Sequence, residues 1–380
     1  MRRLDANSFL ITLLTRLYTA TLLTLLAGSS LVEASAIYSV QNLGSLGSSA
    51  AMVSGINSAG VAVGFVTNTQ GNATPVSLNG QTSALAGSGE ANGINSAGTV
   101  IGTTLSNGAP TVTKWVNGQA ASLNISGYGT SINDAGQVAG GYQTPAGQLH
   151  AFTWTNGSMV DLGTLGGSWS SAYAINGSGQ VAGTSTTATG RFAAFFSSGN
   201  GLLNLGTLGG ANSYGMALNS SGVVVGSSQT AQGYSNAFEW SDGQLLDLGT
   251  LGGSQSYAYG VNNEGAAVGY SYIAGNSATH GFLYSSGILL DLNSLLPIAS
   301  GWTIDQAYAI NDAGDILGMG TFNGQSYAVD LVAPGAGGQV LKNEPLATPE
   351  PAALLLTGAG LILIGTLRRK RPPTVLTEHL

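Results

Sequence analysis

The chain of 380 residues contains no cysteine. This absence excludes disulfide bonds, thiol nucleophiles and cysteine-ligated iron–sulfur clusters. It also removes the thiolate ligands of most structural zinc sites, and no two of the three histidines have metal-ligand spacing. We therefore predict no metal and no cofactor, and expect stability to come from packing and hydrogen bonds alone.

Positive charge is almost as scarce. Charged residues are 7% of the chain, against about 25% in a typical soluble domain. Seven of the ten Lys and Arg residues lie in the two terminal segments, so the body, residues 37–347, has three cations (Lys114, Arg191 and Lys342) against thirteen acids. A body with a net charge of −10 cannot bind nucleic acid by neutralising phosphates.

Long apolar runs are missing from the body and confined to the two ends. Three arginines accompany a short apolar stretch, residues 17–28, which is followed by Ala34-Ser35-Ala36. Ala34 and Ala36 are the small residues that a signal peptidase requires, and the apolar run is too short for a membrane span. Residues 1–36 are predicted to be a secretory signal peptide, with the mature chain beginning at Ile37.

The C-terminal end combines three short elements in a fixed order. Pro349-Glu350-Pro351 precedes an apolar run, Ala352–Leu367, which is followed by Arg368-Arg369-Lys370-Arg371. Sixteen residues form a helix of about 24 Å, short for a bilayer core of about 30 Å but able to cross it if the bilayer thins. The basic cluster places that end in the cytoplasm and the body outside it.

This order of parts, residues 348–371, resembles the PEP-CTERM sorting signal. The resemblance implies export by a Gram-negative bacterium, with the body in the periplasm while helix 352–367 is a transient inner-membrane anchor. Exosortase would then process the tail and release the protein to the cell surface or the medium. A permanent C-terminal anchor is the alternative. Residues 333–347 are predicted to be a flexible linker, and residues 372–380 extend beyond the usual pattern as a tail.

Between these ends a short block, aliphatic-Asn-x-x-Gly-x-x-x-Gly, recurs seven times. Its spacings are 38, 38, 43, 43, 43 and 49 residues, the range of solenoids and propellers. Asn can open a type I turn through its side chain, and Gly three positions later supplies a positive φ. The asparagines are Asn57, Asn95, Asn133, Asn176, Asn219, Asn262 and Asn311.

Each repeat is predicted to contain four short strands. The Asn turn joins the first two, and a second turn such as Asn156-Gly157 or Asp242-Gly243 joins the last two. Residues 37–43 look like a fourth strand without a third, and residues 327–331 like a third strand without a fourth. A ring closed by both termini explains this, so residues 37–332 are predicted to be a seven-bladed all-β propeller. An open β-solenoid is the alternative.

The phrase Leu-Gly-Thr-Leu-Gly-Gly within Asp161–Gly167, Asn204–Gly210 and Asp247–Gly253 resembles the HAF repeat of bacterial extracellular proteins. The His-Ala-Phe of that family is intact only at His150-Ala151-Phe152, and repeats two and three lack the Leu-Gly-Thr-Leu-Gly phrase. The resemblance implies a propeller-like fold and an extracellular location, and no defined activity.

No catalytic constellation is evident. His150 and His280 stand at one repeat position, and Asp161, Asp247 and Asp291 at another. Repetition at equivalent positions favours a structural role, with the acids bonding backbone at a corner of each repeat. We therefore predict that the protein is not an enzyme. A hydrolase or lyase acting on polysaccharide is the alternative, and it would need carboxylates or a histidine outside the repeat positions.

Four aromatic residues, Trp169, Tyr214, Tyr257 and Trp302, fall between the fourth strand of one repeat and the first strand of the next. In such connections exposed rings can stack on sugars. They are the candidate ligand-stacking residues of a surface or matrix protein that binds exopolysaccharide or other surface proteins. A purely structural spacer is the third alternative. Signal peptidase and exosortase are the expected partners during export, and the membrane is contacted only through the C-terminal helix.

Overall fold

The computed structural model describes residues 38–44, 50–68, 70–79, 82–106 and 108–333. The chain divides into two units, Met1–Gly338 and Gln339–Leu380, and the second lies wholly outside the described residues. The predicted signal peptide and its cleavage site, linker positions 334–347, sorting signal, transmembrane helix and tail also lie outside them. Within the described ranges no helix has the length and apolar character to span a bilayer.

The described residues are almost entirely β-strand. The first half contains β1 (Ser39–Gly44), β2 (Ala50–Ile56), β3 (Ala62–Thr67), β4 (Ala73–Leu78), β5 (Thr82–Ala84), β6 (Gly89–Ile94), β7 (Val100–Ser106), β8 (Ala109–Val116), β9 (Gln119–Ile132), β10 (Val138–Gln143), β11 (Leu149–Thr155), β12 (Ser158–Gly163), β13 (Gly166–Ile175) and β14 (Val181–Thr187). The second half contains β15 (Phe192–Ser197), β16 (Leu203–Asn204), β17 (Gly209–Leu218), β18 (Val224–Thr230), β19 (Ser235–Ser241), β20 (Gln244–Gly249), β21 (Gly252–Val261), β22 (Ala267–Ile273), β23 (Thr279–Ser285), β24 (Ile288–Asp291), β25 (Trp302–Ile310), β26 (Ile316–Phe322) and β27 (Gln325–Val332). Two 3-10 helices, η1 (Ala274–Asn276) and η2 (Leu292–Leu295), flank β23 and β24.

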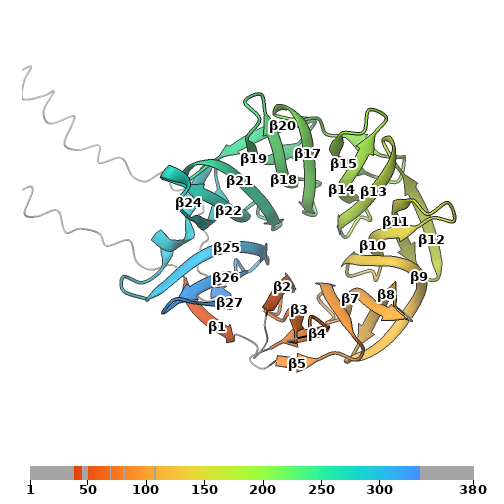
Figure 1. Cartoon of the computed structure of the whole chain (residues 1–380), viewed down its shortest axis with the longest axis horizontal. Helices are drawn as coiled ribbons and strands as arrows, with labels where there is room; N and C mark the ends of the chain where they lie inside the picture. The colour runs from red at the N-terminus through yellow and green to blue at the C-terminus, as the bar shows by residue number, and fades with distance from the viewer. Residues whose placement is uncertain (1–37, 45–49, 69, 80–81, 107, 334–380) are drawn as a thin grey trace, which may run out of the picture. The chain divides into compact units, whose positions relative to one another are not determined.

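These strands form antiparallel sheets arranged as a propeller-like ring in the first unit (Figure 1). Four sheets are separate and four-stranded: β2–β5, β17–β20, β21–β24, and β25–β27 together with β1. The prediction of seven separate four-stranded blades is wrong in its count, because repeats two, three and four share one eleven-stranded sheet.

The sheets merge there for two reasons. Strand β9 is fourteen residues long and pairs with β8 through its first part and with β10 through its last part. A parallel pairing of Leu149 with Trp169 then joins β11 to β13. Continuous hydrogen bonding therefore crosses repeat boundaries that separate sheets elsewhere in the ring.

The two ends of the described chain meet in one sheet. Strand β1 pairs antiparallel with β27, with Val40 opposite Leu331 and Gln41 opposite Asp330. Leu317 and Ala328 of that sheet also pack in one apolar cluster with Val53 of the first repeat. The predicted closure of the ring by both termini is confirmed, and an open solenoid does not describe this structure.

The predicted turns are present. In the turn that begins at Asn133, the Gly136 N–H donates to the Asn133 carbonyl at 3.0 Å, and Gly136 has a φ of +76°. Gly179 and Gly222, at the same repeat position, have φ values of +76° and +86°. Positive φ favours glycine because a Cβ is strained there. The second turn of the repeat adopts two consecutive positive φ values at Asn117-Gly118, Asn156-Gly157 and Asp242-Gly243.

The last glycine of the Asn-x-x-Gly-x-x-x-Gly block allows two neighbouring strands to approach closely. A Cβ added to Gly226 of β18 would lie 1.9 Å from the Tyr214 carbonyl oxygen of β17, at a register shift in that strand pair. Around this strand pair the core is divided into small clusters, each shared by two neighbouring repeats. One such cluster packs Ala182 and Ala194 against Val224 and Phe238.

Candidate functional site

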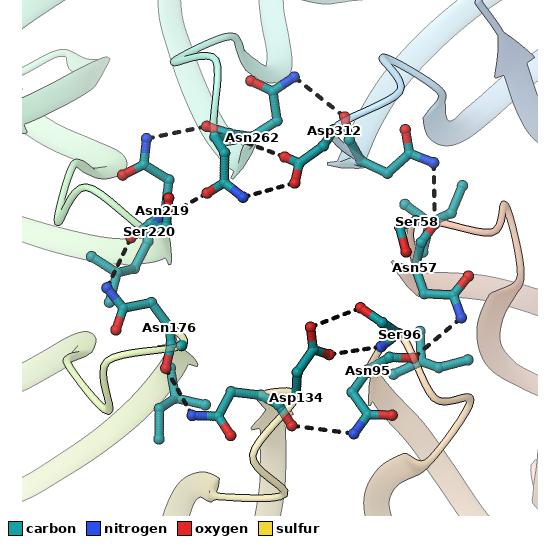
Figure 2. Close-up of a pocket in the computed structure, with 18 of the residues that line it drawn as sticks. Asn57, Ser58, Asn95, Ser96, Asp134, Asn176, Asn219, Ser220, Asn262 and Asp312 are labelled. Carbon is teal, nitrogen blue, oxygen red and sulfur yellow. Dashed lines mark hydrogen bonds between the residues drawn. The ribbon is translucent and has the colours of Figure 1, made fainter. Parts of the chain in front are cut away.

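The centre of the ring is bounded by the seven repeat asparagines. Each side-chain amide donates its Nδ2–H to the backbone carbonyl of the asparagine in the next repeat (Figure 2). The distances run from 2.8 to 3.2 Å, and the last bond, from Asn311 to Asn57, closes the circle. All seven side chains are buried.

The same side chains also stabilise their own turns. In the fourth repeat, the Asn176 Oδ1 accepts from the N–H groups of Ser178 at 3.1 Å and Gln180 at 3.0 Å, while its Nδ2 bonds Asn219. Only the turn role was predicted from the sequence. The sequence does contain a signal for the bond between repeats. An Asp could form the same turn with its side-chain oxygen, but it has no N–H donor, and all seven positions are Asn.

A second set of polar groups lies just after these asparagines and lines a cavity of about 260 Å³ at the mouth of the ring. The Asp134 carboxylate accepts from both the N–H and the hydroxyl of Ser96, each at 2.8 Å. The Asp312 carboxylate accepts from the N–H of Asn263 at 2.8 Å and from its side-chain amide at 2.7 Å (Figure 2). These carboxylates are therefore engaged in contacts between repeats.

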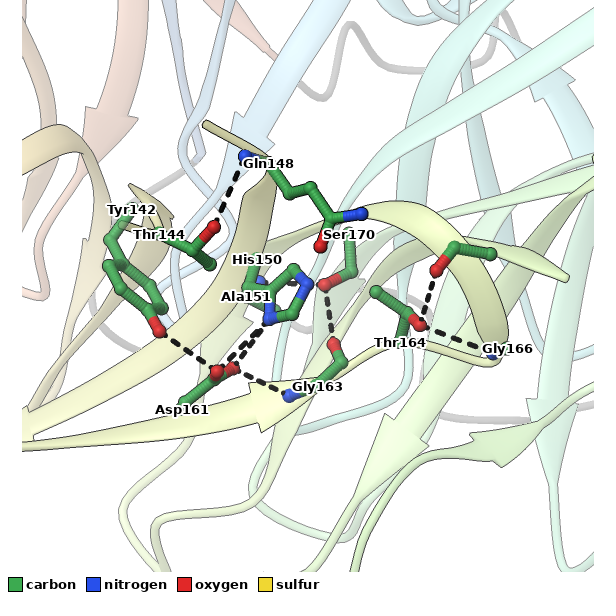
Figure 3. A network of polar contacts seen from close by, with 11 residues as sticks. Tyr142, Thr144, Gln148, His150, Ala151, Asp161, Gly163, Thr164, Gly166 and Ser170 are labelled. Carbon is green, nitrogen blue, oxygen red and sulfur yellow. Dashed lines mark hydrogen bonds and ion pairs between the residues drawn. The ribbon is translucent and has the colours of Figure 1, made fainter. Parts of the chain in front are cut away.

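The recurring His and Asp residues lie next to each other, and Figure 3 shows this for His150 and Asp161. His150 Nδ1 lies 3.0 Å from an Asp161 carboxylate oxygen, and the Gly163 N–H donates to the same carboxylate at 2.8 Å. The pair recurs as His280 with Asp291 at 2.6 Å. The predicted backbone-bonding role of these acids is confirmed.

The Asp161 corner also contains a tyrosine, whose hydroxyl donates to the carboxylate at 2.8 Å. Burial raises the pKa of Tyr142 to about 12, and the hydrogen bond to Asp161 adds to this. Burial also raises the pKa of Asp161, but the hydrogen bonds from Gly163, His150 and Tyr142 outweigh it, so the net pKa of Asp161 is lowered. The carboxylate is held ionised, as suits a hydrogen-bond acceptor at a structural corner.

Beyond these pairs, the described part of the chain contains no group of three or more His, Asp or Glu residues placed to hold a metal ion. Asp330 is another acid with a shifted pKa. It is buried in β27 with one carboxylate oxygen unpartnered, and burial together with the charge of Asp315 raises its pKa to about 7. This acid lies in the sheet that closes the ring, where it pairs across strands with Gln41.

The four candidate stacking aromatics lie in strands and not in the predicted connections, because the first strand of these repeats starts earlier than expected. Residues 166, 209 and 252 already pair with the end of the second strand. The aromatics lie in β13, β17, β21 and β25 and are half-buried. They are Trp169, Tyr214, Tyr257 and Trp302.

These rings pack on other aromatics of the protein. Phe192 lies between Trp169 and Tyr214, with ring centroids 5.7 and 5.5 Å away. Tyr257 packs on Tyr270 at 5.2 Å, and Trp302 packs on Phe322 at 5.0 Å. The structure thus brings two of the four together through Phe192 and leaves the other two in separate clusters. Their contacts are those of packing residues.

No protein-family model matches the chain, and no curated protein sequence matches it. Among solved structures, the β-propeller domain of the Trilobed protease from Pyrococcus furiosus is similar at 13% identity, over 64% of this chain and 83% of that one, with a TM-score of 0.46. A puromycin-hydrolysing peptidase of Mycobacterium tuberculosis is similar at 11% identity and a TM-score of 0.49, over 73% of this chain, which spans about half (52%) of that peptidase.

The lectin BP39L of Burkholderia pseudomallei is similar at 10% identity, over 79% of this chain and 99% of that one, with a TM-score of 0.37. Similarities at these identities and TM-scores carry no argument about ligand or activity.

Proposed function

We propose that the protein is an exported cell-surface or extracellular-matrix protein whose propeller is a rigid, non-catalytic scaffold for binding exopolysaccharide or neighbouring surface proteins. The observation that carries this proposal is that the recurring polar groups of the propeller form hydrogen bonds within the protein itself. The ring asparagines bond the next repeat and the corner aspartates bond local backbone, so these groups hold the scaffold together. The remaining surface offers few charges and many hydroxyl and amide groups, which suit recognition of a polyhydroxylated ligand.

The export part of the proposal depends on the two terminal segments. A protein released by its producing cell should begin near Ile37 and lack the basic cluster 368–371. Mass spectrometry of the released protein measures both ends. Recovery of peptides from 368–371 in the released fraction would contradict exosortase processing and favour a permanent anchor.

The binding part is tested with protein purified from the producing cells and the exopolysaccharide of the same cells. We expect co-sedimentation of the two without any increase in reducing ends or unsaturated sugar products. A rise in either product would support the alternative of a polysaccharide hydrolase or lyase. Absence of binding to the polysaccharide and to other surface proteins would leave the structural spacer as the better description.

A further inference from the structure

The second and third repeats are shortened at one place in the fold. Leu85 and Leu205 are equivalent, since the N–H of each donates to the third strand of its own repeat. From Leu205 to the next ring asparagine, Asn219, there are fourteen positions, and from Leu85 to Asn95 there are ten. The third repeat is shortened by the same four positions, which accounts for most of the difference between spacings of 38 and 43.

The four absent residues belong to the connection that, in later repeats, covers the end of the second strand. In later repeats Leu165, Leu208 and Leu251 of the Thr-Leu-Gly-Gly phrase form bridges with residues at that strand end. Within the described residues, the second and third repeats have no such bridge. In the second repeat the connection still bonds this strand end, because the Leu105 N–H donates to the Ser88 carbonyl at 3.1 Å. The shortened connections nevertheless leave this rim of the ring less covered at two adjacent repeats.

Two cavities occupy the opening. One, of about 430 Å³, is lined by Asn72, Glu90, Leu105, Pro110 and Tyr128, among others. The buried Thr103, whose hydroxyl has no hydrogen-bond partner, also lines it. The other, of about 390 Å³, is also lined by Pro110 and Tyr128 and includes Gln143 and Leu149. Because the cavities share Tyr128 and Pro110, they lie next to each other, and we call the two together the rim groove.

Tyr128 differs from the tyrosines at its repeat position. Tyr214 and Tyr257, each five residues before a ring asparagine as Tyr128 is, lie opposite Ser227 and Tyr270 and pack on aromatic rings. Tyr128 lies opposite Gly141, which has no side chain to cover it, and its side chain is 46% exposed.

Neither Tyr128 nor Glu90 makes a side-chain hydrogen bond, ion pair or ring contact with the residues that the structure describes. An exposed ring beside unengaged polar groups is the chemistry of a carbohydrate site, where the ring stacks on the apolar face of a sugar and polar groups bond its hydroxyls.

We infer that the rim groove binds a neutral oligosaccharide, an inference that rests on the glycan-binding function proposed above. The Tyr128 ring stacks on one sugar, and the Glu90 carboxylate accepts hydrogen bonds from sugar hydroxyls. The side-chain amides of Asn72 and Gln143 form hydrogen bonds with the hydroxyls of the neighbouring sugars. Glu90 and a body charge of −10 disfavour acidic sugars. The two adjacent cavities, of about 430 and 390 Å³, are sized for more than one sugar unit.

The test uses the full chain, purified in detergent, on an array of neutral hexose oligomers and uronic-acid oligomers, with neutral hits measured by isothermal titration calorimetry. We expect Tyr128→Ala to weaken binding of the neutral hit at least tenfold. Tyr128→Phe should stay within threefold, because the ring remains, and Glu90→Gln should weaken binding severalfold. Met52→Ala is the matched control, since Met52 occupies the same repeat position in the first repeat and is 44% exposed.

The outcomes separate this inference from the proposed function. Undiminished neutral-glycan binding by both Tyr128→Ala and Glu90→Gln would overturn the rim groove and leave glycan binding by the protein intact. Binding only to uronic-acid oligomers would overturn the neutral ligand class. A wild-type protein that binds no glycan would overturn both this inference and the polysaccharide arm of the proposed function. If Tyr128→Ala fails to fold, Glu90→Gln decides.

Discussion

At the residue scale, the repeat motif is explained by backbone geometry. Gly136 has a φ of +76°, and a Cβ built on it would meet no atom within 4 Å. Any cost of a side chain there is therefore conformational and not steric. Gly177 lies in the next repeat's turn with no atom within 4 Å and without a positive φ, so it provides the comparison.

We expect Gly136→Ala to lower the free energy of unfolding by about 1–2 kcal/mol, the cost of the left-handed conformation for a residue with a Cβ. Gly177→Ala should change it by less than about 0.5 kcal/mol. Urea unfolding followed by circular dichroism measures both. Equal midpoints for the two variants would show that the turn does not need a positive φ.

Asp330 makes stability depend on pH through its raised pKa. Its pKa of about 7 in the folded protein lies above the value of about 3.9 in an unfolded chain. Between these values the folded protein keeps a proton that the unfolded chain has released. The stabilisation is therefore fully present below about pH 4 and is lost as the pH rises through about 7.

We expect Asp330→Asn to remove this loss and to make the protein more stable than wild type at pH 8, by about 2 kcal/mol. Urea midpoints at pH 5 and pH 8 measure the effect. Asp242→Asn, which removes a carboxylate at an exposed turn, is the control. A wild-type midpoint that does not fall between pH 5 and pH 8 would contradict the prediction.

At the scale of elements, neighbouring sheets are joined by side-chain amides as well as by apolar clusters. Asn176 shows the arrangement: its Nδ2 donates to the Asn219 carbonyl at 3.0 Å and to Gln180 Oε1 at 2.6 Å, while its Oδ1 serves the local turn. An aspartate would keep the turn contacts and lose both donors. The substitution therefore removes the contact between repeats together with the bond to Gln180, and it keeps the backbone contacts of the turn.

We expect Asn176→Asp to lower the free energy of unfolding by about 1–3 kcal/mol, because it leaves a buried carbonyl without its donor. Asn124→Asp, at an exposed position outside the ring, should have little effect. Chemical unfolding of both variants at pH 7 measures the difference. If Asn176→Asp is as stable as wild type, the asparagine ring contributes only its turns.

At the scale of the whole molecule, closure depends on a strand from one terminus completing a sheet built at the other. Strand β1 covers the edge of β27 from Ala328 to Val332. An uncovered strand edge promotes aggregation. We therefore expect the closure to limit aggregation as well as to stabilise the folded protein.

We expect Cys introduced together at Val40 and Leu331, which are opposite each other in the register, to form a disulfide and to raise stability by about 2–4 kcal/mol under oxidising conditions. The chain has no other cysteine. Non-reducing electrophoresis and thermal unfolding measure the bond and its effect. Val40→Cys with Leu246→Cys, an exposed residue of β20, is the control. A folded double variant whose thiols at Val40 and Leu331 stay free would contradict the closed ring.

Much of the architecture can be predicted from the sequence, because it follows from local rules repeated seven times. Turn-forming Asn and Gly at constant spacing predict the hairpins, and incomplete repeats at the two ends predict closure. The corner role of Asp161 follows from its recurrence at equivalent positions. The turns depend on residues that are close in sequence, and closure follows from the number of strands in each repeat. Both can be predicted without knowing how side chains pack.

The remaining features arise from contacts between residues distant in sequence. The long β9 merges sheets across repeat boundaries, and the predicted stacking residues are covered by neighbouring aromatics such as Phe192 and Tyr270. Tyr128 is left open because its cross-strand partner is Gly141 and the adjoining connection is four residues shorter. Which of several similar aromatics is exposed depends on what packs beside it in three dimensions, and a one-dimensional repeat pattern does not contain that information.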